Sequence, residues 1–191
     1  MLRNKLIEAM GTLKLYGMKG ALDEVLAAAP PTPVLRVLDL YSGSGLFGLP
    51  LAQRGHGVTM VEENAQAVKD AAENLRTNKI PSGPVRLLCA RAEDLLPGGR
   101  NQGPKLRDID LAVIDPPRDG CPPAVIRALF EVLHPRRVVY VSCNPEALAR
   151  EMPAMLAAGY RAERVLPVDM FPHTDHIETV VTLGRKSLPE Q

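Results

Sequence analysis

The chain has 191 residues, enough for one domain with a well-buried core, and its formal net charge of +1 provides no field that would attract nucleic acid. Aromatic residues make up 4%, which argues against an exposed platform for stacking bases. The three cysteines are widely spaced without a CxxC pair, which argues against a disulfide framework, a zinc site or an iron–sulfur cluster. Neither a signal peptide nor a membrane-spanning run is recognisable, so we expect no membrane contact and a reducing, cytoplasmic location.

Residues 1–33 are predicted to form an N-terminal helical extension that ends in a proline-rich linker. Apolar residues recur at three- and four-residue steps from residue 3 to residue 29, while glycines weaken the middle. One helix and two short helices both fit this pattern. Three prolines between residues 30 and 33 then interrupt the helix, and we assign residues 34–191 to a single further domain.

Strands and helices are predicted to alternate through that second domain. Helices are expected at residues 46–54, 65–78, 123–133 and 145–158. Seven strands are expected at residues 34–40, 58–61, 85–89, 110–114, 138–141, 162–169 and 177–183. This alternation predicts an α/β fold, a Rossmann-like sheet of seven strands with helices on both faces.

A glycine-rich turn follows the first predicted strand, in the run from Asp39 through Tyr41 to Gly43 and Gly45. Glycines let the backbone approach a ligand closely, and the next helix begins with free N–H donors. Glu62 ends the second strand, where Rossmann-like sites place an acid on a ribose hydroxyl. The alternative for Glu62 is a negative charge at the start of a helix. The turn in front of it favours the ribose role.

Two further candidates end buried strands. Asp115 ends the fourth strand, and the two prolines after it forbid an immediate helix, so Asp115 is expected to face the crevice at the carboxyl edge of the sheet. A plain turn residue is the alternative. Cys143 stands between the fifth strand and a helix capped by Asn144, where N–H groups and the helix dipole favour a thiolate. The alternative there is a small buried cysteine in an apolar core.

Residues 34–184 resemble the catalytic domain of the S-adenosylmethionine-dependent RNA uridine-C5 methyltransferases, which modify 23S rRNA and tRNA. The order and spacing of the matching segments make the resemblance specific, and the last two are nearest to the rRNA branch. The matching segments are Leu38-Asp39-Leu40-Tyr41, Asp115-Pro116-Pro117-Arg118, Val141-Ser142-Cys143-Asn144-Pro145 with Leu148-Ala149-Arg150, and Asp169-Met170-Phe171-Pro172-His173-Thr174 followed by Glu178. The resemblance implies a class I methyltransferase sheet whose last strand inserts antiparallel.

The resemblance also implies a mechanism. Cys143 would add to C6 of uracil, C5 would take the methyl group, and Glu178 would then remove the C5 proton and release the thiolate. Asp115 would hold the base or the methyl donor near the thiolate. The implied cofactor contacts are Asp39, Tyr41, Gly43, Gly45, Glu62 and Asp115, and no metal is implied. His173 is either a catalytic helper or a histidine that packs the crevice wall.

Several positions depart from the family pattern. Leu46 stands where an Asn often contacts the cofactor, and Arg91 where an Asn or Asp is frequent. Residues 1–33 match neither the family's RNA-binding module nor its upstream Gln-containing segment. The resemblance implies RNA as the substrate. Because residues 1–33 match no RNA-binding module, we expect a partner protein or another domain to supply part of the affinity for RNA. Two other functions fit the sequence: methylation of an amino group on an RNA base, and a methyltransferase-like binding module without catalysis.

Overall fold

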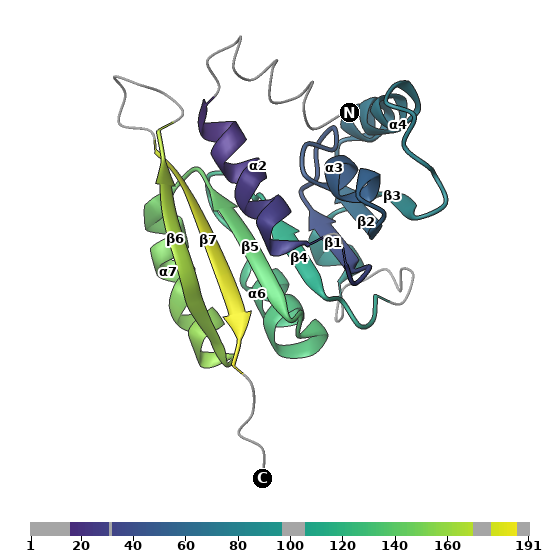
Figure 1. The fold of residues 1–191 in the computed structure, drawn as a ribbon. Coiled ribbons are helices and arrows are strands. Elements are labelled where there is room, and N and C mark those ends of the chain that lie inside the picture. The colour runs from purple at the N-terminus through teal and green to yellow at the C-terminus, as the bar shows by residue number, and fades with distance from the viewer. Residues whose placement is uncertain (1–15, 31, 97–105, 170–176, 187–191) are drawn as a thin grey trace.

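The structure is a computed structural model, and it describes residues 16–30, 32–96, 106–169 and 177–186. Its centre is a seven-stranded sheet in the order β3-β2-β1-β4-β5-β7-β6 (Figure 1). The strands are β1 Arg36–Leu40, β2 Gly57–Glu62, β3 Val85–Cys89, β4 Leu111–Ile114, β5 Arg137–Ser142, β6 Tyr160–Val168 and β7 Glu178–Arg185. The first five strands are parallel, and β7 pairs antiparallel with both β5 and β6. The predicted fold class is therefore confirmed.

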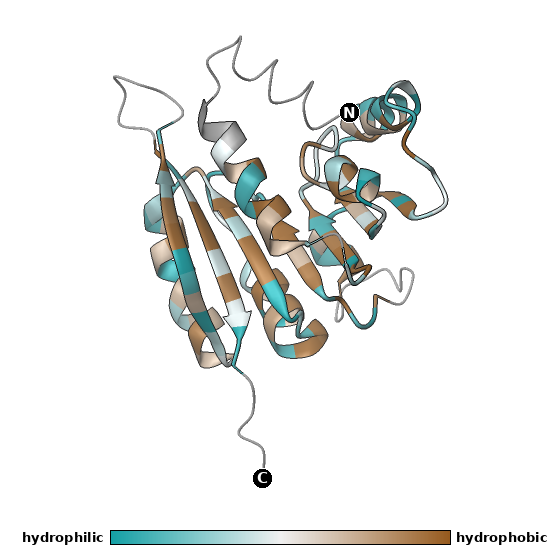
Figure 2. Ribbon diagram, viewed as in Figure 1, coloured by the Kyte–Doolittle hydropathy of each residue, from teal (hydrophilic) through white to brown (hydrophobic). Residues whose placement is uncertain are grey.

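Burial explains why the central strands were recognisable. All four residues of β4 are buried, as are five of the six in β5, because helices cover both faces of a parallel sheet. Figure 2 shows β5 largely in the hydrophobic colour, whereas the edge strand β6 carries hydrophilic stretches. A long apolar edge strand would invite pairing with another chain, and the charged residues of β6 oppose this.

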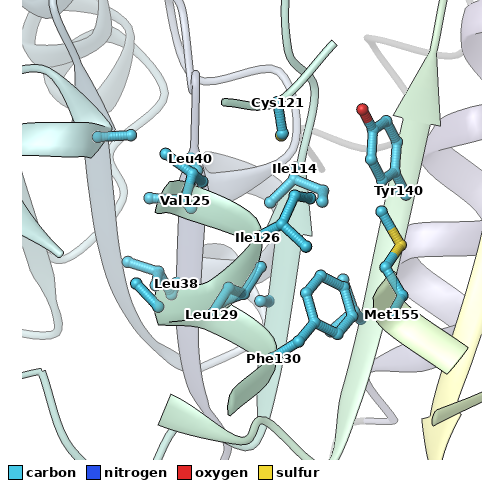
Figure 3. Packing of buried hydrophobic residues seen from close by; sticks show 14 of the residues in the cluster. Leu38, Leu40, Ile114, Cys121, Val125, Ile126, Leu129, Phe130, Tyr140 and Met155 are labelled. Carbon is cyan, nitrogen blue, oxygen red and sulfur yellow. The ribbon is translucent and has the colours of Figure 1, made fainter. Parts of the chain in front are cut away.

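Helices lie on both faces of the sheet (Figure 1). One face is covered by α2 Tyr16–Ala28, α3 Gly48–Gln53 and α4 Ala65–Thr77. The other is covered by α5 Ala92–Leu95, α6 Pro123–Arg127, the π-helical turn η1 Ala128–Leu133 and α7 Pro145–Ala157. Figure 3 shows the second layer, in which Leu38 and Ile114 of the sheet belong to one apolar cluster with Phe130 of η1. None of the helices in the described ranges is both long and apolar enough to cross a membrane.

Two asparagines cap helices, and the cap at Asn144 confirms the prediction. Asn64 Oδ1 accepts hydrogen bonds from the N–H groups of Gln66 and Ala67, at 2.9 and 3.2 Å. Asn144 Oδ1 accepts from Glu146 and Ala147, at 3.1 and 3.3 Å. Each side chain satisfies N–H groups that the first helical turn leaves without a partner. These local contacts fix where the chain turns after β2 and β5.

Two predicted helices differ in detail. The helix predicted at 123–133 is α-helical only to Arg127 and continues as η1 until His134, whose φ of 48° ends it. In the N-terminal segment, α2 lies in the described part and residues 1–15 lie outside it. Leu22 and Val25 of α2 are fully buried, and α2 packs on β5, β6 and β7. The last part of the predicted extension thus contributes to the core of the sheet domain.

Candidate active site

Three of the predicted site residues meet where β4, β5 and β7 adjoin. Asp115 follows β4 and Cys143 follows β5, so both lie at the carboxyl edge of the parallel strands. Glu178 begins β7, whose antiparallel register pairs Thr179 with Ser142. Glu178 therefore lies one ladder step beyond that pair, across from Cys143. Sheet pairing brings together a cysteine and a glutamate that are far apart in the sequence.

The ionisation of Cys143 differs from the sequence prediction. Burial raises the pKa of the Cys143 thiol, and the carboxyls of Glu178 and Asp115 raise it further. A backbone N–H and the Arg118 guanidinium lower that pKa, but by less. A backbone N–H at the helix start does favour the thiolate, as predicted, but burial, and then the acids Glu178 and Asp115, outweigh this contribution. The thiol is therefore protonated at neutral pH until another group takes its proton.

The two carboxyls beside the thiol also hold their protons tightly. Burial, and then the charge of Glu178, raise the pKa of Asp115 to about 7. Burial raises the pKa of Glu178 as well, while Arg118 lowers it. Glu178 Oε2 is buried without a hydrogen-bond partner among the described residues. Carboxyls with raised pKa values can both accept and donate protons near neutral pH, as general acids and bases must.

Asp39 lies beneath the glycine-rich turn with an exposure of 0%. Burial, followed by the charges of Asp115 and Glu62, raises its pKa to about 8, although the nearby amide of Gly48 lowers it. The carboxyl is therefore neutral at pH 7. A methyl group at Gly48 would lie 2.7 Å from Asp39 Oδ2, which shows how closely the helix start covers this acid. Asp39, a predicted cofactor contact, is thus buried against the helix start, and neither of its carboxyl oxygens has a hydrogen-bond partner among the described residues.

The turn itself has a shape that requires glycine. Gly43 and Gly45 have φ angles of 52° and 97°, in the left-handed region that glycine adopts without strain. The Gly45 N–H donates to the Ser42 carbonyl at 2.9 Å, and Asn74 Nδ2 donates to the Ser44 carbonyl at 3.0 Å. A hollow of about 390 Å³ lies over this turn. Its lining includes residues 41–47, Asn74, Asn78 and Asp115.

A second hollow of about 260 Å³ lies on the other side of Tyr41. Its lining includes Glu63 and Arg91 at the ends of β2 and β3, and Pro117 and Asp119 of the loop after β4. Tyr41 has a φ of 60° and lines both hollows. The site is therefore a divided groove along the carboxyl edge of the sheet, with Tyr41 at the division. Leu46 and Arg91, which depart from the family pattern, each line one of its parts.

Glu62 braces the turn. Its Oε2 accepts a hydrogen bond from the Gly43 N–H at 2.9 Å, and its Oε1 accepts from the Asn64 N–H at 2.8 Å. The two readings of Glu62 are therefore not exclusive, because each carboxylate oxygen has a second lone pair that a hydroxyl group could use. The acid holds the glycine turn and the start of α4 in register.

Sequence reasoning missed some residues of the site. Asn74 and Asn78 belong to α4 and its C-terminal cap, where no local pattern marks them as lining residues. Arg118 was recognised only as a basic residue, although it influences both Cys143 and Glu178. His173 lies outside the described residues. In the described ranges, no group of three or more His, Cys, Asp or Glu residues could hold a metal ion.

Together, the order of the strands, the antiparallel β7 and the glycine turn after β1 define a class I methyltransferase fold, a class that uses S-adenosylmethionine. A tRNA (uracil-54, C5)-methyltransferase from Pyrococcus abyssi, solved in complex with S-adenosyl-L-homocysteine, superposes with a TM-score of 0.70 and 32% identity, over 86% of this chain and 38% of that one. The magnesium protoporphyrin IX methyltransferase of Synechocystis, with bound S-adenosylmethionine, has a TM-score of 0.68 at 15% identity and shows the fold alone.

The sequence comparisons define the family. The family model described as tRNA (uracil-5-)-methyltransferase matches residues 32–186, so the chain belongs to this family. An uncharacterized RNA methyltransferase of Gloeobacter violaceus is 41% identical over 161 residues, which are 84% of this chain and 33% of that protein. One of Staphylococcus epidermidis is 41% identical over 183 residues, 94% of this chain and 37% of that protein. The chain thus spans about a third of the length of these curated relatives.

Proposed function

We propose that the chain transfers a methyl group from S-adenosylmethionine to C5 of a uridine in RNA, through a covalent adduct between Cys143 and C6 of the base. Family membership supports the reaction class. The observation that carries the adduct is the register of β5 and β7, which puts Glu178 across from Cys143. A nucleophile and a base on opposite sides of one ladder step can work on the adjacent C6 and C5 atoms of a single ring.

The steps follow from the protonation states. Asp115, with a pKa of about 7, is ionised in a large fraction of molecules at neutral pH and is suited to take the thiol proton. The sulfur then forms a bond to C6, and the electron pair of the C5–C6 double bond shifts to make C5 nucleophilic. C5 would then attack the methyl group of the donor's sulfonium, and the S–CH3 bond would break with its electron pair left on the sulfur of S-adenosyl-L-homocysteine. Glu178 finally removes the C5 proton, the double bond re-forms, and the Cys143–C6 bond breaks.

The charge of the groove also fits this methyl donor. Burial raises the pKa values of both Asp115 and Glu178, the charge of Glu178 raises that of Asp115 further, and Arg118 is the cation that lowers the pKa of Glu178. A sulfonium near Asp115 would supply positive charge, and would lower the pKa of that acid and of Cys143. The donor's adenosyl part would lie beside Tyr41, with Glu62 on the ribose hydroxyls. Gly43 and Gly45 let the donor approach the backbone closely.

We further propose rRNA rather than tRNA as the substrate, because the segments around Cys143 and residues 169–174 are nearest to the rRNA branch. The basic residues that the sequence offers for RNA include Arg118, Arg150, Arg136 and Arg137. Arg136 precedes β5 and Arg137 begins it, at the end of the strand opposite Cys143, and they pair with Asp110 at 3.7 Å and with Glu163 at 3.6 Å respectively. Of these four, Arg118 acts on Cys143 and Glu178, and Arg150 lies on α7, the helix that follows Cys143.

RNA binding by the chain alone should therefore be weak and sensitive to salt. With about two phosphate contacts, log K should fall with log salt at a slope near −1.4 for single-stranded RNA. Fluorescence anisotropy at several salt concentrations measures this slope. Nanomolar binding that persists at high salt would mean that another recognition surface exists.

Trapping the adduct tests the mechanism. Glu178→Gln removes the base that is needed only after methyl transfer, so this variant should accumulate a protein–RNA adduct that survives denaturing electrophoresis. Cys143→Ala should form no adduct and should lose methylation by at least about a thousandfold. The assay uses the target RNA, with the partner or domain that supplies RNA affinity, and nucleoside mass spectrometry identifies the product.

Controls separate this reaction from its rivals. RNA carrying 5-fluorouridine should capture the unsubstituted protein, because fluorine at C5 cannot be removed as a proton. An amino-group methyltransferase would keep its activity in Cys143→Ser and would form no adduct in any variant. A binding module would show no methylation at all, and calorimetry at millimolar S-adenosylmethionine would show no heat. Methylation that proceeds while Cys143 stays unmodified on 5-fluorouridine RNA would refute the nucleophilic role.

A further inference from the structure

We propose that Glu151 is a positioning residue that ties the loop of residues 115–121 to α7 and so holds Arg118 beside Cys143. The catalytic importance of this contact rests on the function proposed above, whereas the hydrogen bonds that Glu151 makes do not depend on that function. Glu151 is in the second turn of α7, the helix that begins directly after Cys143. The loop leaves β4 at Asp115 and reaches α6 through Arg118, Gly120 and Cys121.

One carboxylate connects three elements. Glu151 Oε1 accepts a hydrogen bond from the Cys121 N–H at 2.8 Å, and Glu151 Oε2 accepts from the Tyr140 hydroxyl at 2.7 Å. Tyr140 is a fully buried residue of β5, three positions before Cys143. In Figure 3 its hydroxyl points out of the apolar packing toward the end of the cluster where Cys121 lies. The loop exit is therefore bonded to the same strand and helix that flank Cys143.

The loop backbone packs directly on this carboxylate. Gly120 has a φ of 86°, and a side chain there would collide with the Glu151 carboxylate. The Gly120 N–H donates to the Pro117 carbonyl at 2.8 Å, which makes a tight turn around Arg118. Asn144 Nδ2 donates to the Arg118 carbonyl at 3.0 Å. Residues of α7 and its cap thus hold the loop at two points, on either side of Asp119.

The cluster does not form a second reactive centre. Burial, and then the charge of Glu151, raise the pKa of the Cys121 thiol to about 12, and Cys121 is only 5% exposed. Such a thiol stays protonated and shielded at any physiological pH. Burial also raises the pKa of Glu151, against hydrogen bonds from Tyr140 and Cys121 that lower it. The hydrogen bonds offset part of the cost of burying the carboxylate, as a fixed support for the loop requires.

The position of the loop affects the ionisation of Cys143 through Arg118. Among the described residues, the groups that act on the ionisation of Cys143 are Glu178 from β7, and Asp115 and Arg118 from the loop. Arg118 favours the thiolate and also lowers the pKa of Glu178. Asp115 stays attached to the sheet, because its N–H donates to the Leu40 carbonyl at 3.3 Å. Loosening the loop would therefore move Arg118 away and leave the two acids in place.

The three cysteines of the full-length chain provide the test, without RNA or cofactor. Iodoacetamide alkylation between pH 7 and 10 is followed for each cysteine by peptide mass spectrometry. Cys89, which is exposed at the end of β3, serves as the internal control, Cys143 reports the site, and Cys121 reports the loop exit. Glu151→Gln and Tyr140→Phe each weaken the network. Tyr160→Phe is the matched control, because this equally buried tyrosine donates its hydroxyl to the Pro135 carbonyl at 2.6 Å, away from the loop.

We expect Glu151→Gln to slow Cys143 alkylation at pH 8 by about threefold, the scale on which one partly exposed charge changes a thiolate population. Cys121 should become more reactive, and Cys89 should not change. Tyr140→Phe should act in the same direction, while Tyr160→Phe should leave Cys143 at the wild-type rate. The sign is informative, because the loss of a negative charge alone would make the Cys143 thiolate easier to form, not harder.

A double-variant cycle decides whether the effect passes through Arg118. Arg118→Gln should slow Cys143 by the same factor, and adding Glu151→Gln to it should cause no further change. An unchanged Cys143 rate in Glu151→Gln, or a further fall in the Arg118→Gln background, would overturn the proposal. The outcome is independent of methylation, so a correct network in a protein that does not methylate would refute the proposed function alone.

Discussion

The two sides of the groove are built in different ways. On the cofactor side, which comprises residues 41–45 and Glu62, the backbone turn is braced within the protein, because both Glu62 oxygens accept backbone hydrogen bonds. On the thiol side, which comprises Asp115, Arg118, Cys143 and Glu178, acids of like charge meet without such a brace. Each side keeps one buried atom without a partner among the described residues, the Tyr41 hydroxyl and Glu178 Oε2, and both have hydrogen-bonding capacity for a ligand.

This difference shows how one fold can bind and react at the same edge. The glycine turn can hold a ligand through the shape of its backbone, and this kind of binding needs little charge. Proton transfer at neutral pH is helped by carboxyls with raised pKa values. Burial raises the pKa of Glu178, and burial together with the charge of Glu178 raises the pKa of Asp115 to about 7. Asp39 joins the two sides, since both Asp115 and Glu62 raise its pKa from opposite directions along the sheet edge.

The largest expected effect comes from breaking the cofactor side from below. In Gly48→Ala, the new methyl group would lie 2.7 Å from Asp39 Oδ2 and 2.8 Å from Met60 Cγ, inside normal contact distances. Overpacking of this kind should lower the free energy of unfolding by about 2–3 kcal/mol. Thermal and urea unfolding measure the change. Gly83→Ala is the control, because nothing lies within 4 Å of a methyl group there. Equal stability of the two variants would contradict the close packing under the turn.

A smaller effect is expected from removing the brace of the turn. Glu62→Ala should weaken the binding of S-adenosylmethionine by roughly 1.5–3 kcal/mol, the scale of a charge-assisted hydrogen bond, with part of the loss due to a looser Gly43. Isothermal titration calorimetry gives the affinity. Glu73→Ala is the control, because Glu73 pairs at the surface with Arg76 at 2.6 Å and lines neither hollow. If Glu62→Ala binds as tightly as the wild type, Glu62 does not belong to the cofactor site.

The same contrast explains what could be predicted from the sequence. Buried strand runs, the glycine turn and the caps at Asn64 and Asn144 are local features, and local chemistry marks them. The thiol side depends on sheet pairing, and only the family resemblance joined Cys143 to Glu178. The net ionisation of Cys143 differs from the prediction, because the helix start is visible in the sequence, whereas the burial of the thiol and the opposing acids are not. From the sequence, Glu151 is indistinguishable from an acid on a helix surface, because its hydrogen bonds with Tyr140 and Cys121 depend on the tertiary fold.

The smallest expected effect, counted per pH unit, is the change in stability with pH that Asp39 contributes between the two sides of the groove. Asp39 has a pKa of about 8 in the folded protein, against about 3.9 in an unfolded chain. Between these values the folded state holds a proton that the unfolded state has released, so stability falls as the pH rises from about 4 to about 8. One such group contributes a slope of at most about 1.4 kcal/mol per pH unit, or roughly 4 °C in Tm.

Asp39→Asn should remove this contribution, because an amide resembles the neutral acid and does not titrate. Tm measured from pH 5 to 8 should therefore fall less steeply in Asp39→Asn than in the wild type, whatever the absolute stability of the variant. Asp115 adds a slope of the same sign in both proteins, because its pKa is also raised. Asp108→Asn is the control, since Asp108 is exposed and pairs with Arg36 at 3.1 Å. Parallel Tm curves for Asp39→Asn and the wild type would mean that Asp39 is ionised in the folded protein. An ionised Asp39 would then need a positively charged group to stabilise it, and no such group is among those that act on its pKa.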